Sequence, residues 1–407
     1  MKKILIILFC MNLFISNIAF ADDDIEVEEL QDTQIELVSS NSSKEPITYS
    51  KNIIVIDRKT LLPLYEKDAY TKVAMASTTK ILTCILAIEN SSMNEIVTIS
   101  QKAATVSGST LGLITGMEIT MNDLLYGLML RSGNDCAIAV AEHISGSVEN
   151  FSILMNQKSS ELGLQNSNFI TPHGLDNSNH YTTAYDLAIL TDYALKNSTF
   201  REIVSCKNYT ISFNGFPRTI SNTNELLGNL EGVYGVKTGF TFEAGRCLVS
   251  ACKRNDLDII VVVLGANTKN IRTKDSYNLI NYIFDTYSYI NISSTLDDAF
   301  SNYISYFNEN YFLEKTTTSP ILKLDALENY NFPLSSTDVL ELHTKFYTID
   351  TFNSDILPGS TIGKLYLYKD QTLLCEVNVI IENQLIRNDW KYYLKNIFSI
   401  YKLNNNL

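Results

Sequence analysis

The order of two kinds of hydrophobic pattern limits the folds open to this chain. A β-branched run at 52–57 is followed, after a four-residue gap, by a second apolar segment at 61–65, which is hairpin spacing. Helical spacing then takes over, and strand-like runs return from about residue 205. Strands, then helices, then strands again predict an α+β domain whose antiparallel sheet is closed by strands from both ends. The predicted strands are 52–57, 61–65, 209–213, 232–237, 246–252 and 257–264, and the predicted helices are 79–88, 121–130, 136–144, 151–164 and 276–287.

The pattern changes after about residue 290. The composition shifts to Asn, Tyr, Thr and Ser, with short alternating runs at 362–368 and 373–381 that predict a small all-β domain. In the last twenty residues, apolar side chains recur at helical spacing with basic residues between them. We expect an amphipathic helix that associates with a membrane surface, and the alternative is a helix packed on the β domain. Its apolar residues are Trp390, Tyr393, Leu394, Ile397, Ile400 and Tyr401, and its basic residues are Arg387, Lys391, Lys395 and Lys402.

The N-terminus has the features of an export signal. Lys2 and Lys3 precede an apolar stretch at 4–15, and Ala19 and Ala21 are the small residues that a signal peptidase reads. The stretch is shorter than the ~20 residues of a membrane span, which favours cleavage after Ala21 over an uncleaved anchor. The acidic segment that follows reads as a solvated tether, so we expect the mature protein to act outside the cytoplasm.

Charge and cysteine usage exclude several classes of function. The net charge of −13 argues against nucleic-acid binding, which needs a basic surface. The 7 cysteines are scattered and form no CxxC pair, so neither a disulfide framework nor a zinc ribbon is expected. With 407 residues the chain is long enough for two or three domains of roughly 150 residues.

Three short motifs carry residues suited to catalysis. Ser77 and Lys80 lie three residues apart at the predicted start of a helix, where a lysine can accept the proton of a hydroxyl nucleophile. Ser132-Gly133-Asn134 falls in a turn between two predicted helices, and Lys237-Thr238-Gly239 at the end of a predicted strand. Taken singly, each has a structural explanation as a helix cap, a turn or a strand end. The Ser-x-x-Lys pattern also occurs at Ser250 and Ser399, in neither case at a helix start.

The order of the three motifs is more specific. Together they resemble the low-molecular-mass penicillin-binding proteins that act as D-alanyl-D-alanine carboxypeptidases, over about residues 49–287. The resemblance implies the β-lactamase/transpeptidase-like fold, acylation by penicillin, and removal of the terminal D-alanine from peptidoglycan stem peptides. The matching segments are Ala76–Lys80, Leu124–Tyr126, Arg131–Asp135, Thr171–Asp176, Asn222–Asn224 and Gly235–Gly239.

The resemblance also implies a role for each motif residue. Ser77 would be the nucleophile and Lys80 its proton acceptor, while Ser132 would relay a proton to the leaving amine. Asn134 would hydrogen-bond the substrate peptide, Lys237 and Thr238 would bind its terminal carboxylate, and Gly239 would allow close approach of the backbone. The backbone N–H groups of Ser77 and Phe240 would form the oxyanion hole. Phe240 stands where His or Tyr is common in the family, a departure that could alter rate or substrate preference.

Three alternatives remain open at this point. A serine β-lactamase needs an additional Glu, and Glu225-Leu226-Leu227-Gly228-Asn229 does not have the expected residue order. A zinc D,D-peptidase could use His173, Asp176 and His180, which is the minimum ligand set. The third is an inactive wall-binding module.

No cofactor or metal is expected for the serine mechanism. The predicted divisions are a signal peptide at 1–21, a tether at 22–47, a catalytic domain at 48–288, a β domain at 289–386 and the amphipathic helix at 387–407, peripheral on the outer face of the cell membrane.

Overall fold

The computed structural model describes residues 44–213, 215–311, 320–327, 330–348, 356–385, 390–391, 393–395 and 397–398. The expected signal peptide and most of the acidic tether lie outside these residues. The chain divides into two compact units, Met1–Asp285 and Thr286–Leu407.

A five-stranded antiparallel sheet forms the centre of the first unit. Its strand order is β2-β1-β9-β8-β7. Because β1 pairs with β9, the N-terminal hairpin and the late strands join in one sheet, as the order of patterns predicts. The strands are β1 (Asn52–Asp57), β2 (Pro63–Lys67), β7 (Val233–Thr241), β8 (Gly245–Arg254) and β9 (Leu257–Ala266).

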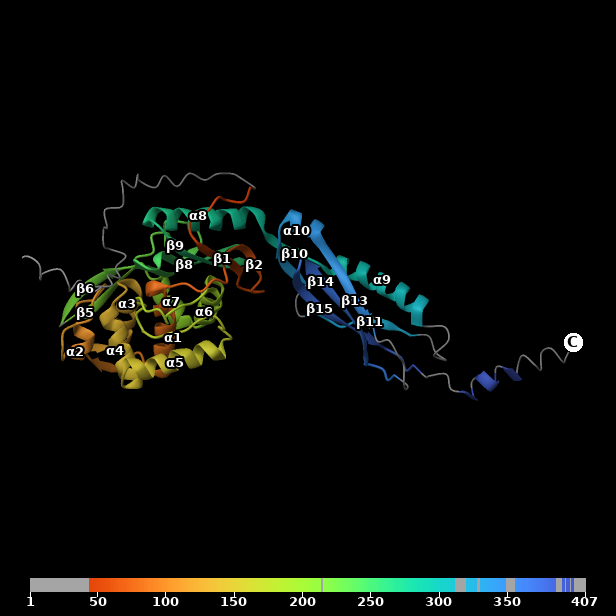
Figure 1. Cartoon of the computed structure of the whole chain (residues 1–407), viewed down its shortest axis with the longest axis horizontal. Helices are drawn as coiled ribbons and strands as arrows, with labels where there is room; N and C mark the ends of the chain where they lie inside the picture. The colour runs from red at the N-terminus through yellow and green to blue at the C-terminus, as the bar shows by residue number, and fades with distance from the viewer. Residues whose placement is uncertain are drawn as a thin grey trace, which may run out of the picture. The chain divides into compact units, whose positions relative to one another are not determined.

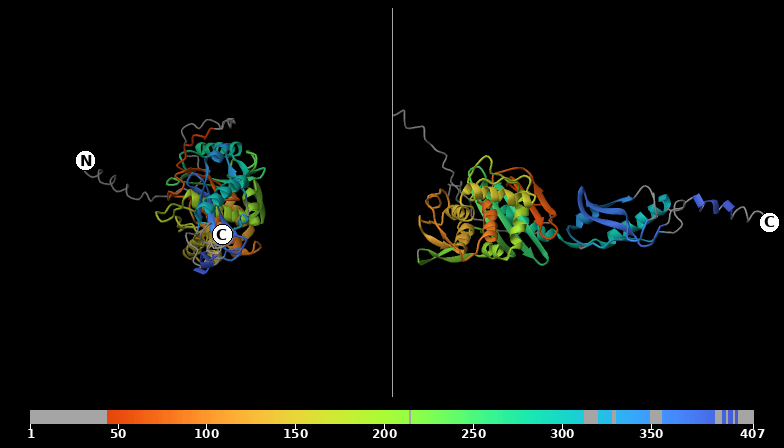
Figure 2. Two further views of the ribbon diagram at one scale, coloured as in Figure 1. Left: turned by 90° about the vertical axis from the view of Figure 1, so that its right-hand side faces the viewer. Right: turned by 90° about the horizontal axis from the view of Figure 1, so that it is seen from below.

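Helices cover both faces of this sheet. Helix α8 (Lys269–Thr286) lies on one face and a cluster of helices on the other, as Figures 1 and 2 show. All six residues of β1 are therefore buried, which explains its continuous apolar run. The helices of the cluster are α1 (Lys80–Asn90), α3 (Met121–Leu130), α4 (Asn134–Ser145), α5 (Val148–Glu161), α6 (Ala184–Lys196) and α7 (Ser198–Ser205).

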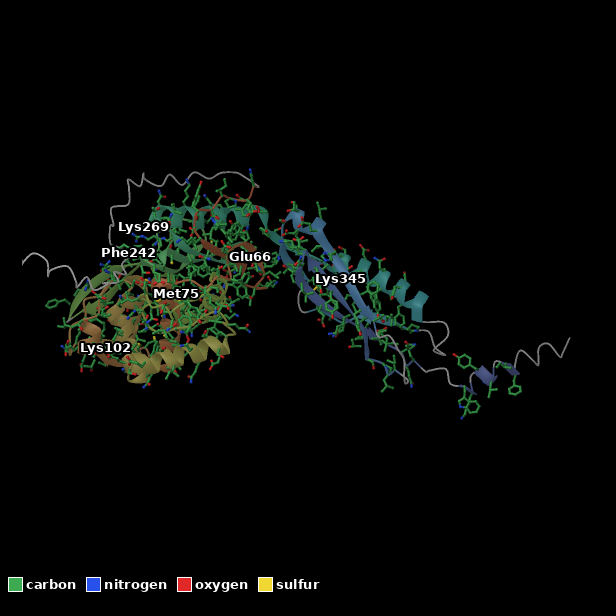
Figure 3. All side chains as sticks on the ribbon, viewed as in Figure 1. Glu66, Met75, Lys102, Phe242, Lys269 and Lys345 are labelled. Atoms are coloured by element: carbon green, nitrogen blue, oxygen red, sulfur yellow. The ribbon has the colours of Figure 1, made fainter. Side chains whose placement is uncertain are left out.

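Short elements complete the first unit. A 3₁₀ turn, η1 (Ala76–Thr79), leads directly into α1. Met75, just before it, is fully buried, whereas Lys102 lies at the edge of the domain (Figure 3). The other short elements are α2 (Gln101–Ala104), β3 (Ile96–Thr98), β4 (Glu118–Thr120), β5 (Asn208–Phe213) and β6 (Phe216–Ser221).

The predicted end of the strand at 232–237 is wrong. Strand β7 continues through Lys237-Thr238-Gly239 to Thr241, so this motif lies within the strand. The ladder persists because β8 pairs residue by residue along this stretch, from Lys237 opposite Val249 to Thr241 opposite Gly245. The motif is thus held by main-chain hydrogen bonds on one side.

The second unit contains the expected small sheet, and two helices that the sequence analysis did not anticipate. Four antiparallel strands lie in the order β11-β15-β14-β13. Tyr303 of α9 (Ser293–Tyr311) is fully buried, and its hydroxyl donates to Thr348 Oγ1 of β13 at 3.1 Å. The other elements are β10 (Ser288–Asn291), β11 (Leu322–Leu324), β12 (Asn331–Leu334), α10 (Ser336–Glu341), β13 (Leu342–Thr348), β14 (Thr361–Lys369) and β15 (Thr372–Ile381).

Candidate active site

Ser77 lies in η1, clamped between two glycines from distant parts of the chain. A Cβ atom on Gly174 would lie 1.9 Å from the Ala76 carbonyl oxygen, and one on Gly239 would lie 3.0 Å from the Ser77 nitrogen. Ala76 adopts φ +48°, a strained value for a residue other than glycine. Ser77 itself is only 4% exposed. The packing of the two glycines against this turn fixes the position of its backbone and of the serine hydroxyl.

Lys80 lies one turn below Ser77 and is fully buried. Its Nζ donates to Ser77 Oγ at 2.8 Å, to Asn134 Oδ1 at 2.8 Å and to the His173 carbonyl at 2.9 Å. Three oxygen acceptors around the amine compensate for its removal from water. The Nζ–Oγ distance is within the range for direct proton transfer.

The turn between α3 and α4 carries Ser132 and leads into Asn134, whose Oδ1 accepts from Lys80. Ser132 has φ +60° and is 4% exposed, and Asn134, fully buried, donates from Nδ2 to the Ser107 carbonyl at 2.7 Å. Asp135 accepts three backbone N–H groups from residues 111–113 at 2.8–3.0 Å. The carboxylate therefore fastens a neighbouring loop to the turn, a function that the sequence did not reveal.

Lys237 and Thr238 come from the edge strand β7, and each is 1% exposed. Lys237 Nζ donates to the Thr238 carbonyl at 3.0 Å. The Thr238 hydroxyl lies 2.6 Å from the hydroxyl of Thr223. Thr223 was not singled out from the sequence, although it is the central residue of the Asn222-Thr223-Asn224 landmark.

Phe240 follows the motif and is 8% exposed. The guanidinium carbon of Arg246 lies 3.9 Å from the centre of its ring, and the ring centres of Phe240 and Phe242 lie 5.6 Å apart in a T-shaped arrangement. Both distances are typical of the pairs concerned, a cation–π pair with Arg246 and an aromatic pair with Phe242. These contacts fix the Phe240 side chain beside Arg246 of the neighbouring strand.

The loop that carries His173, Asp176 and His180, called the histidine loop below, is held by hydrogen bonds to neighbouring residues. His180 Nδ1 accepts the Ile170 N–H at 2.9 Å, and Nε2 lies 2.8 Å from Thr79 Oγ1. Burial lowers the pKa of His180 to about 4. For His173, burial and then the charge of Lys80 hold the pKa well below its usual value. Asp176 accepts from Thr241 Oγ1 at 2.5 Å. These side chains fasten the loop to η1 and β7.

Glu225, the residue considered for a β-lactamase, is held by residues of α8. Its carboxylate pairs with Lys269 Nζ at 2.7 Å, accepts from Thr273 Oγ1 at 2.9 Å and lies 3.6 Å from Arg272 Nη2. These contacts give it a structural role at the start of α8.

The fold and the site define a penicillin-binding serine peptidase. A family model described as D-alanyl-D-alanine carboxypeptidase matches residues 39–268. The chain is 32% identical over 352 residues to the D-alanyl-D-alanine carboxypeptidase DacF of Bacillus subtilis, covering 85% of this chain and 88% of the relative. The chain therefore belongs to the D-alanyl-D-alanine carboxypeptidase family of serine peptidases, the low-molecular-mass penicillin-binding proteins.

Solved structures agree with this assignment. A mutant of the Streptomyces K15 DD-transpeptidase is 34% identical, with a TM-score of 0.56, over 58% of this chain and 98% of that one. The carboxypeptidase DacD of Francisella tularensis, at 24% identity, has a TM-score of 0.66 over 86% of this chain and 98% of that one, which shows the shared fold. The β-lactamase, zinc-peptidase and inactive-module alternatives are not favoured by these findings.

Proposed function

We propose that Ser77 removes the terminal D-alanine from peptidoglycan stem pentapeptides through an acyl-enzyme. The observation that carries this is the Lys80 Nζ at 2.8 Å from Ser77 Oγ, with both side chains buried. In its neutral amine form Lys80 takes the hydroxyl proton as Oγ attacks the carbonyl of the penultimate D-alanine. The C–N bond breaks as this proton passes from Lys80 through Ser132 to the departing amine. A water molecule then gives a proton to Lys80 and attacks the ester, and Ser77 Oγ leaves as the hydroxyl with that proton.

The residues of β7 beside Ser77 are suited to recognition of the substrate. Lys237 places a cation beside Thr238, and both suit a free terminal carboxylate on an otherwise acidic protein. The backbone N–H groups of Ser77 and Phe240 are proposed to stabilise the oxyanion. Gly239, packed against the Ser77 turn, allows β7 to approach the nucleophile closely.

The test is product analysis on purified muropeptides with pentapeptide stems. We expect release of one D-alanine per stem, no release by Ser77→Ala, and unchanged release by Ser250→Ala, which alters the same Ser-x-x-Lys pattern in β8. Insensitivity to EDTA is expected, and rapid turnover of nitrocefin is not. Release that persists in Ser77→Ala would contradict the proposal.

The C-terminal segment, of which residues 390–391, 393–395 and 397–398 are described, supports the proposal that the protein lies peripherally on the outer face of the membrane. Its described residues are helical, and the exposed fractions of Trp390, Ile397 and Phe398 are 66%, 62% and 63%. Lys391 and Lys395 are also exposed. None of the described helices combines the length and the apolar composition that a membrane span requires. Exposed aromatic residues beside lysines suit the surface of an anionic bilayer.

Liposome co-sedimentation tests this part of the proposal. Deletion of residues 388–407 is expected to abolish binding to anionic vesicles while activity on a soluble peptide is retained. Binding by the intact chain should weaken with added salt. Unchanged sedimentation, or loss of stability in the deletion variant, would favour a helix that packs on the β domain.

A further inference from the structure

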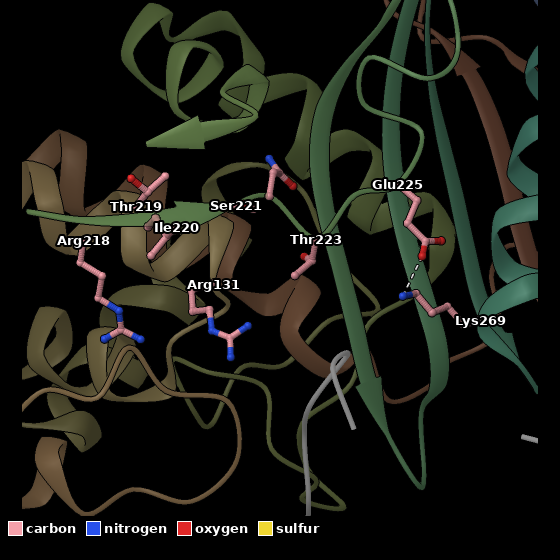
Figure 4. A pocket seen from close by; sticks show the side chains of 9 residues that line it. Arg131, Arg218, Thr219, Ile220, Ser221, Thr223, Glu225 and Lys269 are labelled. Carbon is pink, nitrogen blue, oxygen red and sulfur yellow. Dashed lines mark ion pairs between the residues drawn. The ribbon is translucent and has the colours of Figure 1, made fainter. Parts of the chain in front are cut away.

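A basic pocket of about 450 Å³ lies on the β7 side of the candidate site. Its lining includes three cations, Arg131, Arg218 and Lys269, and one carboxylate, Glu225. Figure 4 shows the two guanidinium groups towards one end and the Glu225–Lys269 pair towards the other, with Thr223 between them. Because Arg218 is exposed, this side of the site is in contact with solvent.

The contacts between the histidine loop and η1 are buried instead. His180 is 3% exposed and Thr79 is fully buried. Both nitrogens of the His180 ring and the Thr79 hydroxyl are hydrogen-bonded to protein atoms. These polar groups are engaged inside the protein, so any effect that they have on the reaction must act through the atoms that they hold.

The two hydrogen bonds of the His180 ring select one neutral tautomer. Nδ1 accepts the Ile170 N–H at 2.9 Å, so Nδ1 carries no proton. The ring proton is therefore on Nε2, which lies 2.8 Å from Thr79 Oγ1 and donates to it. The Thr79 hydroxyl in turn donates to the Ala76 carbonyl at 2.9 Å. The result is a chain of hydrogen bonds that runs in one direction, from His180 through Thr79 to Ala76.

The Ala76 carbonyl and the Ser77 N–H belong to one peptide group. In a planar trans peptide the C=O and N–H bonds point in opposite directions, so a contact that fixes one also fixes the other. A Cβ atom on Gly174 would lie 1.9 Å from the Ala76 oxygen, and one on Gly239 would lie 3.0 Å from the Ser77 nitrogen. The carbonyl edge of this peptide thus faces the histidine loop, and its N–H edge faces β7.

The turn depends on such contacts because its backbone is strained. Ala76 has φ +48°, and a strained backbone persists only where its surroundings hold it. Thr79 is the N-cap residue of α1, but its hydroxyl is directed back to the carbonyl of Ala76, three residues earlier. The hydroxyl therefore holds the strained residue itself.

We propose that Thr79 and His180 are positioning residues that set the direction of the Ser77 N–H in the oxyanion hole. The inference rests on the proposed function, in which this N–H stabilises the charge that develops on the attacked carbonyl. Without the chain, the peptide between Ala76 and Ser77 is free to tilt, and its N–H no longer points at the oxyanion. Acylation then slows, whereas binding before acylation, which rests on Lys237 and Thr238, is retained.

The acylation kinetics of the full-length protein with penicillin test the role of Thr79. Stopped-flow measurements separate the dissociation constant of the initial complex from the acylation rate constant. Thr79→Val removes the hydroxyl and keeps the branched shape. We expect the rate constant to fall about 10- to 100-fold with the dissociation constant little changed, because a misdirected donor costs less than an absent one. Thr79→Ser, which keeps the hydroxyl, should acylate close to the wild-type rate.

Two polar variants test the role of His180. His180→Asn retains an acceptor near the position of Nδ1 but has no N–H that reaches Thr79, so its acylation should slow in the same sense. His180→Gln places an amide N–H near the position of Nε2 and should acylate faster than His180→Asn. This pair decides the inference even if Thr79→Val does not fold. A wild-type rate in His180→Asn would contradict it.

The matched control removes a hydroxyl that fastens the same loop to a different element. Thr83 of α1 is fully buried and donates to the Pro172 carbonyl at 2.6 Å. Thr83→Val should lower the free energy of unfolding in urea as Thr79→Val does, but acylate at the wild-type rate. Equal slowing of acylation in the two variants would reduce the chain to a fastening of the loop.

The carbonyl stretch of the penicilloyl ester reports on the oxyanion hole directly, because hydrogen bonds to the ester oxygen lower its frequency. Infrared difference spectra with penicillin ¹³C-labelled at the β-lactam carbonyl identify this band. We expect a higher frequency in Thr79→Val and His180→Asn, and the wild-type frequency in Thr79→Ser and Thr83→Val. An unchanged band in Thr79→Val would overturn the inference.

These measurements also separate the inference from the proposed function. If the wild-type protein is acylated but releases no D-alanine from muropeptides, the proposed function fails and the acylation rates still decide the inference. If D-alanine is released and Thr79→Val acylates at the wild-type rate, the inference fails alone. Absence of acylation in the wild-type protein would overturn both.

Discussion

The two sides of the candidate site differ in how their side chains are held. On the helical side, Ser77, Lys80 and Asn134 are buried and bonded to one another. On the other side, β7 presents buried Lys237 and Thr238, but Arg218 in the adjoining pocket is exposed. The side chains proposed to make and break bonds are held by contacts with one another, and those proposed to bind the terminal carboxylate are equally buried, whereas the arginine beside them stays in contact with water.

The largest effect is expected on the helical side. Lys80→Ala removes the proposed proton acceptor and should slow acylation by penicillin about 10³-fold or more. The matched control is Lys253→Ala, from the Ser-x-x-Lys pattern in β8, which should acylate at the wild-type rate. Stopped-flow acylation rates measure both. A loss of less than tenfold in Lys80→Ala would remove the lysine from the proposed chemistry.

A smaller effect is expected for Lys237. Lys237→Ala should lower kcat/KM on the natural peptide about 10- to 100-fold through loss of a carboxylate partner. An ester substrate without the terminal carboxylate should lose much less. Equal losses for peptide and ester would mean that Lys237 acts on the reaction and not on recognition, and the division between the two sides would not hold.

Because His180 of the histidine loop is buried, we expect the free energy of unfolding to fall in acid. The pKa of His180 is lowered from 6.5 to about 4, so the unfolded chain takes up this proton first as the pH falls. The stabilisation is complete above pH 6.5 and is lost towards pH 4. Between pH 7 and 5 the free energy of unfolding should fall by about 2 kcal/mol through this residue. Urea denaturation should show a correspondingly smaller fall in His180→Gln; an identical fall would contradict the assignment.

Thr223→Val should have the smallest effect. It removes the hydroxyl that lies 2.6 Å from Thr238 Oγ1 but leaves the shape of the residue. One hydrogen bond corresponds to about 1 kcal/mol, so we expect a rise in KM of roughly fivefold with kcat little changed. A matched Thr219→Val, at another position lining the pocket, should leave KM for the pentapeptide stem at its wild-type value. A fall in kcat without a change in KM would place Thr223 in the chemistry.

Local patterns predicted most of the fold and the centre of the site. The run at 52–57 and the helix at 121–130 have the predicted bounds in the structure. Helical spacing places Ser77 and Lys80 on one face, the resemblance pairs them, and their side chains are in hydrogen-bond contact. The signal for α9 was also present: Leu296, Tyr303 and Phe307 are buried at helical spacing, but the Ser- and Asn-rich composition around them is unfavourable for a helix, and the alternating runs further on indicated strands.

Contacts between distant residues could not be predicted. His180 and Thr79 are 101 positions apart, and Thr223 and Thr238 are joined only because the loop after β6 returns to β7. The basic pocket draws on residues from 131 to 269, none of which forms a local motif with the others. Charge patterning in one dimension does not reveal such a cluster, because the fold brings it together.

The site of the covalent adduct tests the central claim most directly. A fluorescent penicillin is bound to the purified protein, and the adduct is located by intact-mass analysis and peptide mapping. The account predicts one adduct per chain, on Ser77, and none in Ser77→Ala with its fold intact. An adduct on Ser250 or Ser399, or no adduct at all, would contradict it.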